Sequence, residues 1–272
     1  MPKVVLITGG SSGIGEAIAT HLGKNLDYIV YATSRKPVTN QFIGGVTFLQ
    51  LDVTSSQSCE AAVKNLIEKE GKIDVLINNA GIGFAGPIED TSREELHQVL
   101  ETNLYGVLDM CRVVLPYMRQ NKSGRIINIS SLAGRFGLPF RGVYSASKFA
   151  LEGLTESLSQ EVQQFGIQVS IVEPGDFATN ISQNRQTTLA TSNSVYNKQF
   201  TATYNLINQE VAHSLSATIM AKAIEKILRK KKPKLRYVVS TPFQKFTLTL
   251  KALLPDRVFE KLLMNHYKIP AK

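Results

Sequence analysis

The sequence has no tryptophan and contains only two cysteines and four histidines among its 272 residues. Cys59 and Cys111 lie far apart, which excludes a disulfide framework and the paired spacing of a zinc site. None of the histidines lies at ligand spacing from another, so we expect no metal site. Cysteine usage indicates a reducing compartment as the default.

Long hydrophobic runs are also missing. No stretch of about 18 apolar residues is present, and we expect no cleavable leader, since the opening "MPKVVLITGG" reads as a strand that enters a glycine turn. We expect a cytoplasmic protein, with association to a membrane surface as the alternative. The 31 basic and 22 acidic residues give a formal charge of +9, which suits an anionic cofactor, a membrane or nucleic acid. Nucleic acid is disfavoured because no known binding module is present.

Short β-branched segments alternate with helical patterns along the chain. This alternation, with continuously apolar strands, predicts an α/β fold: a Rossmann-type doubly wound parallel sheet of about seven strands with helices on both faces. Strands are expected at 4–7, 28–33, 47–53, 73–79, 125–130, 167–173 and 236–240, and helices at about 13–23, 56–70, 92–120, 144–165 and 216–230.

No linker or repeat divides the chain, so residues 1–272 are interpreted as a single domain. Within it, the segment 180–215 is rich in Ser, Thr, Asn and Gln. We expect a substrate loop there, because so long a connection in a compact domain is usually a lid or a partly disordered loop. A C-terminal helical extension is predicted over 241–272.

The segment "TGGSSGIG" at 8–15 follows the first predicted strand and opens the first predicted helix. Its glycines allow a tight turn and let a pyrophosphate approach the helix N-terminus, where free N–H groups favour anions. The spacing is G-x-x-x-G-x-G, not the general G-x-G-x-x-G. The predicted cofactor contacts in this turn are Gly9, Ser11, Ser12, Gly13, Ile14 and Gly15.

The end of the second predicted strand reads "TSRK" at 33–36 and holds no carboxylate. An acidic residue at this point would bind the ribose 2′-hydroxyl of NAD(H). Ser34 can instead donate to a phosphate, and Arg35 offers a planar fork that suits one. The local charge therefore favours NADP(H) over NAD(H). The alternative is a solvated basic pair at the end of a strand.

Further motifs stand where later strands end. These are "LDV" at 51–53, "NNAG" at 78–81, Ser131 and "PGDFAT" at 174–179. The carboxyl ends of parallel strands are where open α/β sheets bind ligands. With the glycine turn and Tyr144-x-x-x-Lys148, the chain resembles the short-chain dehydrogenase/reductase family over roughly residues 3–180, and more loosely to about 240. The stretches "GLPFRGVYSASKFALEGLTESL" and "PKLRY" are most similar to its 17β-hydroxysteroid and retinol dehydrogenase branch.

The resemblance implies a set of site residues. Ser131 would bind the substrate oxygen, Tyr144 would be the acid/base and Lys148 would hold the nicotinamide ribose. Asn103 would hold a water molecule for proton relay. Implied cofactor contacts, besides Tyr144 and Lys148, are Asp52 and Val53 at the adenine, Asn79 at the adenosine side, Ala80, Gly81, Pro174, Gly175, and Thr179 at the nicotinamide carboxamide.

The chemistry of the tyrosine–lysine pair follows from its spacing. A free tyrosine has a pKa of about 10, too high for a good base near neutrality. Lys148 lies one helical turn along the same face as Tyr144, so its charge, with that of an oxidised nicotinamide, should lower the tyrosine pKa. Ser131 can donate a hydrogen bond to the developing oxyanion. Such a site can reduce or oxidise, and a preference for NADP(H) favours reduction.

The substrate is expected to be a small hydrophobic alcohol, ketone or aldehyde, such as a hydroxysteroid, a retinoid or another lipid-like carbonyl. The predicted substrate residues are Ser131, Leu132, Phe136, Leu138 and Tyr144. Core packing is an alternative for the apolar members of this set. Arg141 departs from a wholly apolar pocket and argues against a steroid.

Partners are expected at two surfaces. Small residues on the helix at 144–165 suit close helix–helix contact, and the family usually pairs through this helix, so we expect a homodimer, with a tetramer as the alternative. The basic segment 229–236 and the amphipathic segment 255–269 suggest a peripheral membrane contact. The alternative is a solvated helix end and a helix docked on the body. A peripheral membrane or regulatory NADP-binding protein with little turnover is the alternative function.

Overall fold

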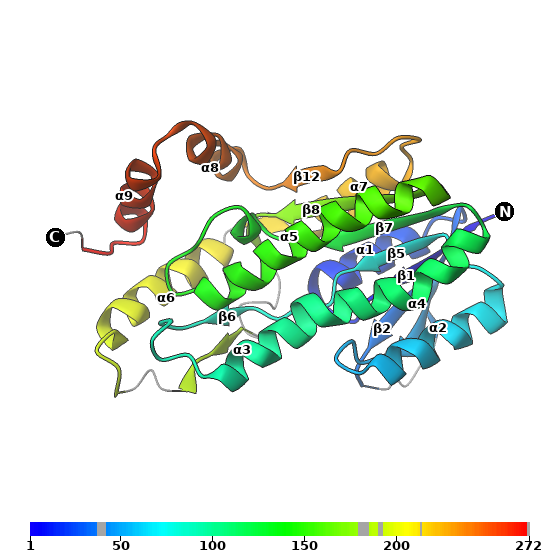
Figure 1. Cartoon of the computed structure of the whole chain (residues 1–272), viewed down its shortest axis with the longest axis horizontal. Coiled ribbons are helices and arrows are strands. Elements are labelled where there is room, and N and C mark those ends of the chain that lie inside the picture. The colour runs from blue at the N-terminus through cyan, green and yellow to red at the C-terminus, as the bar shows by residue number, and fades with distance from the viewer. Residues whose placement is uncertain (37–41, 179–184, 190–192, 213, 271–272) are drawn as a thin grey trace.

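A computed structural model describes residues 1–36, 42–178, 185–189, 193–212 and 214–270. Its centre is an eight-stranded sheet in the order β12-β8-β7-β5-β1-β2-β4-β3, parallel throughout except for β3, which is antiparallel to β4 (Figure 1). The strands are β1 Lys3–Ile7, β2 Tyr28–Ser34, β3 Phe42–Ile43, β4 Val46–Gln50, β5 Val75–Asn78, β7 Gly124–Ile129, β8 Ile167–Pro174 and β12 Arg236–Val239. The predicted fold class is confirmed, and β3 adds a short edge strand to the seven expected.

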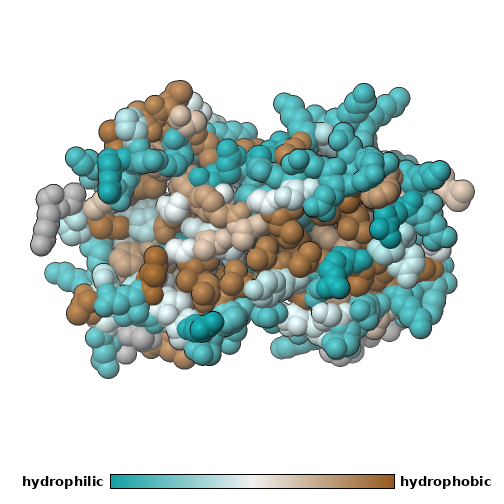
Figure 2. All heavy atoms as spheres, in the orientation of Figure 1, coloured by the Kyte–Doolittle hydropathy of each residue, from teal (hydrophilic) through white to brown (hydrophobic). Residues whose placement is uncertain are grey.

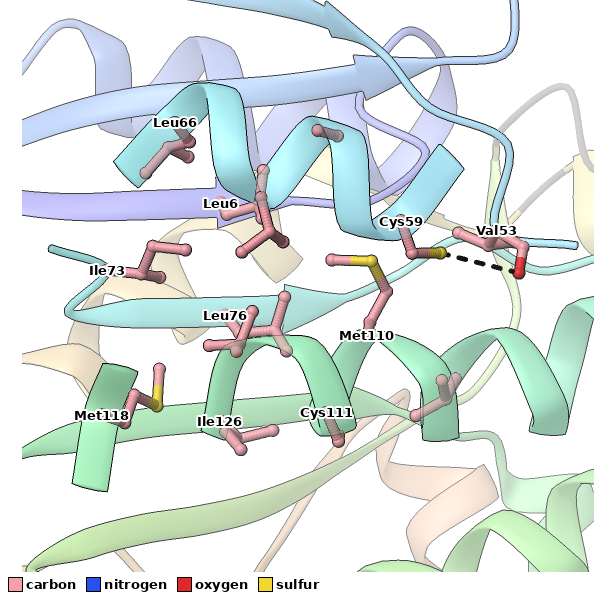
Figure 3. Packing of buried hydrophobic residues seen from close by; sticks show 14 of the residues in the cluster. Leu6, Val53, Cys59, Leu66, Ile73, Leu76, Met110, Cys111, Met118 and Ile126 are labelled. Carbon is pink, nitrogen blue, oxygen red and sulfur yellow. Dashed lines mark hydrogen bonds between the residues drawn. The ribbon is translucent and has the colours of Figure 1, made fainter. Parts of the chain in front are cut away.

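Helices cover both faces of this sheet, as the continuously apolar strands require. One face is covered by α1 Gly13–Gly23 and α7 Ala217–Leu228, and the other by α2 Ser56–Glu70, α4 Gly106–Gln120 and α5 Gly142–Val162 (Figure 1). Figure 3 shows the second layer, where Met110 and Met118 of α4 and Leu66 of α2 lie over strand residues.

Both cysteines belong to this core. Cys59 and Cys111 are free and buried, and burial raises the pKa of the first thiol to about 11 and that of the second to about 12. Figure 3 shows the Cys59 thiol directed at the carbonyl oxygen of Val53. Thiols that hold their protons so tightly are poor nucleophiles, so both residues act as small apolar side chains.

The helix predicted over 92–120 is divided. α3 covers Arg93–Leu100, a π-helical segment covers Glu101–Tyr105, and α4 follows. A hydrophobic pattern cannot separate a π-helical turn from the α-helix around it, which is why the sequence indicated a single helix. Single π-helical turns often occur at functional sites, and this one carries Asn103.

The segment 180–215 contains more structure than the predicted loop. A helix, α6, covers Asn197–Ala212, and its buried side chains Phe200, Thr203, Ile207 and Val211 recur at helical spacing. Ser, Thr, Asn and Gln on its other faces hid this pattern. Short strand pairs join the region to the body, β10 Gln186–Thr187 with β6 Phe84–Ala85, and β11 Leu215–Ser216 with β9 Phe177–Ala178.

The predicted C-terminal extension consists of α8 Pro242–Leu253 and α9 Asp256–His266. α9 docks on the body through Phe259, whose ring meets that of Phe136 edge to face at 5.4 Å, and through the buried Tyr267 that follows it. In the part of the chain that the structure describes, no helix has the length and apolarity needed to cross a bilayer.

Candidate active site

A cleft of about 820 Å³ opens at the carboxyl ends of the parallel strands. The glycine turn after β1 and the "NNAG" turn after β5 meet there, at the point where the chain order of the sheet reverses. The predicted cofactor residues that line this cleft are Gly9, Ser11, Ser12, Gly13, Ile14, Ser34, Arg35, Asp52, Val53, Asn79, Ala80, Gly81, Tyr144, Lys148, Pro174 and Gly175. Gly15 lies behind the turn, and Thr179 falls outside the described residues.

The glycine turn is built for a close approach. Gly9 has φ +64°, and a Cβ there would lie 2.9 Å from the Cα of Ala80. A Cβ on Gly15 would lie 2.3 Å from the carbonyl oxygen of Gly9. The Asn79 amide fixes this arrangement by donating to the carbonyl oxygens of Thr8 at 3.0 Å and Gly9 at 3.1 Å. A cradle that no side chain can fill, at the N-terminus of α1, fits the diphosphate of a dinucleotide.

Ser34 and Arg35 stand at the end of β2 and line the same cleft. Arg35 is exposed, and its guanidinium has no hydrogen bond or ion pair within the described residues. The carboxylate of Asp52, which follows the neighbouring strand β4, accepts from the amide and the hydroxyl of Thr54 at 3.0 and 2.8 Å. Within the described residues, the guanidinium of this cleft-lining residue is therefore available to bind an anion.

Asn103 is fully buried, and the π-helical segment turns it toward the "NNAG" loop. Its Oδ1 accepts from the amide of Ile82 at 2.8 Å, and its Nδ2 donates to the Ile82 carbonyl at 3.0 Å and to the Ser147 hydroxyl at 3.1 Å. A Cβ on Gly81 would lie 3.2 Å from Asn103 Oδ1 and 3.8 Å from Lys148 Nζ. Asn103 and Lys148 therefore converge around Gly81.

Tyr144 and Lys148 lie on the first turns of α5. Lys148 is buried, and its Nζ donates to the carbonyl oxygen of Ile129 at 3.0 Å and lies 5.9 Å from the centre of the Tyr144 ring. Ser131 follows β7, and its hydroxyl accepts from the amide of Ala133 at 3.1 Å. The structure thus places Ser131, Tyr144 and Lys148 at one end of the cleft, with Asn103 behind them.

The electrostatics of Tyr144 differ from the expectation. Burial raises its pKa, while a hydrogen bond with Ser131 and the charges of Arg141 and Arg185 act to lower it. The sequence predicts this role for Lys148 together with an oxidised nicotinamide, whereas in the protein without cofactor the two arginines are the cations with the largest effect on this pKa. Burial of Lys148 lowers its own pKa to about 8, and the charge of Glu152 opposes that shift.

Three charged residues in the cleft were not among the predicted site residues. Arg141, Asp176 and Arg185 line it beside Tyr144. In the sequence, Arg141 stands out only as a departure from an apolar pocket, and Asp176 only as part of the motif "PGDFAT". Arg185 lies in the predicted substrate loop, where no motif singled it out.

The apolar residues predicted to line the substrate pocket lie elsewhere. Leu132 and Phe136 are buried in a cluster with Phe259 of α9, and Leu138 packs against that cluster. The C-terminal helices cover these three residues, which the sequence analysis assigns to the substrate pocket. None of the three is among the residues that line the cleft in the described part of the chain.

The buried lysine gives a prediction about stability. The pKa of Lys148 falls from 10.5 to about 8, so its charge destabilises the folded state by about 3 kcal/mol. The hydrogen bond from Lys148 Nζ to the Ile129 carbonyl oxygen contributes about 1 kcal/mol in the opposite direction. Lys148→Met should therefore stabilise the protein without cofactor by about 2 kcal/mol at pH 7.

The sign of the pH dependence follows from the lowered pKa. The charged ammonium of Lys148 destabilises the folded state by the full amount below about pH 8. This destabilisation disappears as the pH rises toward 10.5, because Lys148 loses its proton at a lower pH in the folded protein than in the unfolded protein. The advantage of the variant should shrink over that range. Urea unfolding at several pH values measures it, with the exposed Lys64→Met as control. A variant less stable than wild type at pH 7 would contradict the cost assigned to this charge.

The parallel sheet with Asn103, Ser131, Tyr144 and Lys148 gathered at its carboxyl edge defines an oxidoreductase of the α/β class. A family model described as short chain dehydrogenase matches residues 3–190. The chain belongs to the short-chain dehydrogenase family, as its motifs predicted.

Two relatives and one solved structure show how far the likeness extends. The chain is 43% identical over 269 residues to a 3-ketodihydrosphingosine reductase of Bacteroides thetaiotaomicron, a match that covers 98% of this chain and 99% of that one. It is 36% identical over 273 residues to retinol dehydrogenase 8 of Bos taurus, covering 94% and 86%. A short-chain dehydrogenase of Streptomyces avermitilis superimposes with a TM-score of 0.80 at 30% identity, covering 98% and 96%.

Proposed function

We propose that this protein is an NADP(H)-dependent reductase of a lipid-like ketone, and that 3-ketodihydrosphingosine is the first substrate to test. The observation that carries the proposal is the convergence of Ser131, Tyr144 and Lys148 on one end of a cleft whose other end presents Arg35. The 43% identity to a 3-ketodihydrosphingosine reductase, over nearly the whole of both chains, supports the choice of substrate.

The residues that line the cleft support the choice of cofactor. The glycine turn and the N-terminus of α1 would hold the diphosphate, and Ser34 with Arg35 would bind a 2′-phosphate. When bound, the nicotinamide supplies the hydride for reduction of the carbonyl. Lys148, which reaches the same cleft from α5, would hold the nicotinamide ribose.

The side chains at the substrate end can polarise a carbonyl and deliver a proton. Tyr144 would donate its phenolic proton to the carbonyl oxygen, and Ser131 would donate a second hydrogen bond to that oxygen as charge develops on it. Burial keeps the phenol protonated in the protein without cofactor, which is the state that reduction requires. Asn103, fixed by the backbone of Ile82, would hold a water molecule behind Lys148 for return of the proton.

The proposal is tested with purified protein, NADPH and a small panel of carbonyls. We expect 3-ketodihydrosphingosine to be reduced with a kcat/KM at least about 10-fold above those for all-trans-retinal and a 17-ketosteroid. Mass spectrometry of the product should show the corresponding alcohol. Failure to oxidise NADPH with any member of the panel would exclude the proposed activity.

A membrane contact is proposed as well, at a surface that differs from the predicted one. The basic segment 229–236 lies at the opposite end of β12 from α8 and α9 (Figure 1). Phe243 and Phe246 of α8 are 68% and 55% exposed, and Figure 2 shows hydrophobic residues gathered over this helix. Lys245 lies between them in the sequence, so this face suits an anionic lipid surface.

Sedimentation with vesicles that contain phosphatidylserine tests whether α8 or the basic segment 229–236 makes the membrane contact. The double variant Phe243→Ser/Phe246→Ser should lose most of its vesicle binding. Lys230→Gln/Lys232→Gln, in the basic segment, should bind nearly as wild type does. The opposite ranking would assign the contact to the basic segment, and no sedimentation of wild type at low salt would exclude a membrane contact.

A homodimer is proposed through the outer faces of α4 and α5. Leu108 and Phe149 are exposed on these helices, which lie in front of the sheet where Figure 2 shows a band of hydrophobic residues. Burial of such side chains against a second copy would remove them from water. Phe149→Glu should convert a dimer to a monomer in analytical ultracentrifugation, and a monomeric wild type would contradict the proposal.

A further inference from the structure

The charged residues beside Tyr144 come from separate parts of the chain. Arg141 precedes α5, Asp176 lies between β8 and β9, and Arg185 precedes β10. All three line the cleft. Their charges act on the Tyr144 hydroxyl, the two arginines lowering its pKa and Asp176 raising it. They therefore line the cleft near the Tyr144 hydroxyl, from which a carbonyl would accept a proton.

Each of these side chains has part of its bonding capacity unused. Arg141 Nη2 donates to the Tyr267 hydroxyl at 2.5 Å, while its Nε is buried and has no hydrogen-bond partner in the described part of the chain. Arg185 Nη1 donates to Asn208 Oδ1 at 2.9 Å. Asp176 Oδ2 accepts from Gln244 Nε2 at 2.7 Å. Within the described residues, neither the two arginines nor Asp176 forms an ion pair.

The chemistry of a ligand for this cluster follows from the hydrogen-bond donors and acceptors that the cluster presents. A guanidinium only donates hydrogen bonds, and a carboxylate only accepts them. A ligand that satisfies the cluster must therefore present a donor to Asp176 and an acceptor oxygen to the arginines. A hydrocarbon ketone would cover these partly exposed charges without pairing them, which is unfavourable.

Asp176 is the only acceptor among the three charged side chains of the cluster. The guanidinium of Arg141 lies 5.5 Å from the ring centre of Tyr267, and that of Arg185 lies 5.6 Å from the ring centre of Tyr204, so both cations have an aromatic face. Within the described residues, the carboxylate of Asp176 accepts from one neutral amide; burial raises its pKa, and the charges of Arg141 and Arg185 act to lower it. A charged donor would form a stronger hydrogen bond with this carboxylate than a neutral donor would.

We propose that Asp176, Arg141 and Arg185 form a head-group site that selects ketones with an ammonium on the carbon beside the carbonyl and a hydroxyl one carbon further on. Asp176 accepts from the ammonium, and the guanidinium groups donate to the hydroxyl oxygen. The inference rests on the proposed function and deepens it, since 3-ketodihydrosphingosine carries this head group. It makes the amine, and not the length of the hydrocarbon chain, the feature that separates substrates from other lipid ketones.

The test compares 3-ketodihydrosphingosine with the same ketone bearing hydrogen in place of its amino group. At about pH 6.5 the amine is charged, because an α-amino group has a pKa of about 7.7–8.0. Wild type should prefer the amino ketone by about 10-fold or more in kcat/KM, the effect of one charge-assisted hydrogen bond. In Asp176→Asn this ratio should fall toward one, and in Asp176→Glu it should be partly retained.

Glu210→Gln is the matched control, because Glu210 is a carboxylate of the neighbouring α6 that pairs with His266 at 3.1 Å and does not line the cleft. It should keep the wild-type ratio. A wild type that reduces both ketones equally would overturn the head-group site alone, whereas a wild type that reduces neither would overturn the proposed function with it. If Asp176→Asn melts well below wild type, the ratio in Asp176→Glu decides, and a ratio of one in that variant rejects the site.

Discussion

Tyr144→Phe should lower kcat for ketone reduction by about 10²- to 10⁴-fold, the range that general acid–base groups contribute. Phenylalanine keeps the aromatic ring at the start of α5 and removes only the hydroxyl, which forms a hydrogen bond with Ser131. The dissociation constant for NADPH should stay within a few-fold of wild type, because the proposed contacts to the phosphates and the adenosine come from other residues of the cleft.

Steady-state rates and fluorescence titration with NADPH measure the two effects separately. Tyr237→Phe is a suitable control, since Tyr237 lies on β12 and its hydroxyl accepts from the amide of Lys234 at 2.7 Å. It should retain the wild-type rate. A Tyr144→Phe enzyme that keeps a tenth or more of the wild-type kcat would show that another group donates the proton.

The second large effect is expected at the end of β2. Arg35→Ala should weaken NADPH by about 10- to 150-fold, because one charge-assisted hydrogen bond contributes about 1.5–3 kcal/mol and about 1.4 kcal/mol is tenfold. Binding of NADH should hardly change. Ser34→Asp should have a greater effect, since a carboxylate repels the 2′-phosphate and accepts from a free 2′-hydroxyl. Preference should move toward NADH.

Dissociation constants for both cofactors in wild type and the two variants are sufficient for this test. Lys64→Ala, which removes an exposed positive charge on α2 far from Ser34 in the sequence, controls for a general loss of charge. Equal affinity of wild type for NADH and NADPH would reject the roles of Ser34 and Arg35.

The sequence predicted the sheet and its helices because both depend on local patterns. All seven predicted strands are present, and α1 and α2 have the predicted bounds. Hydrophobic periodicity and glycine spacing extend over several residues, so they can be recognised in the sequence without knowledge of tertiary contacts. The positions of Ser131, Tyr144 and Lys148 could be predicted for the same reason. Ser131 follows a predicted strand, and Tyr144 and Lys148 lie one turn apart on a predicted helix.

Features that depend on long-range contact could not be read in this way. Arg185 reaches the cleft because β10 pairs with β6, and Asp176 lines the same cleft as Tyr144 because β8 packs beside α5. Neither relation leaves a periodic signal. Leu132 and Phe136 were assigned to the substrate because nothing in the sequence showed that α9 covers them. Asn103 was placed in a helix, but the π-helical turn that directs it toward Ile82 was not predicted.

The most direct test of the account is a single-turnover experiment in which the protein, loaded with NADPH, is mixed with 3-ketodihydrosphingosine. Loss of NADPH absorbance should match, mole for mole, the formation of dihydrosphingosine, and Tyr144→Phe should bind NADPH yet show no comparable phase. Oxidation of NADPH at the same rate in wild type and Tyr144→Phe, or no oxidation in wild type, would contradict a tyrosine-dependent reductase of this ketone.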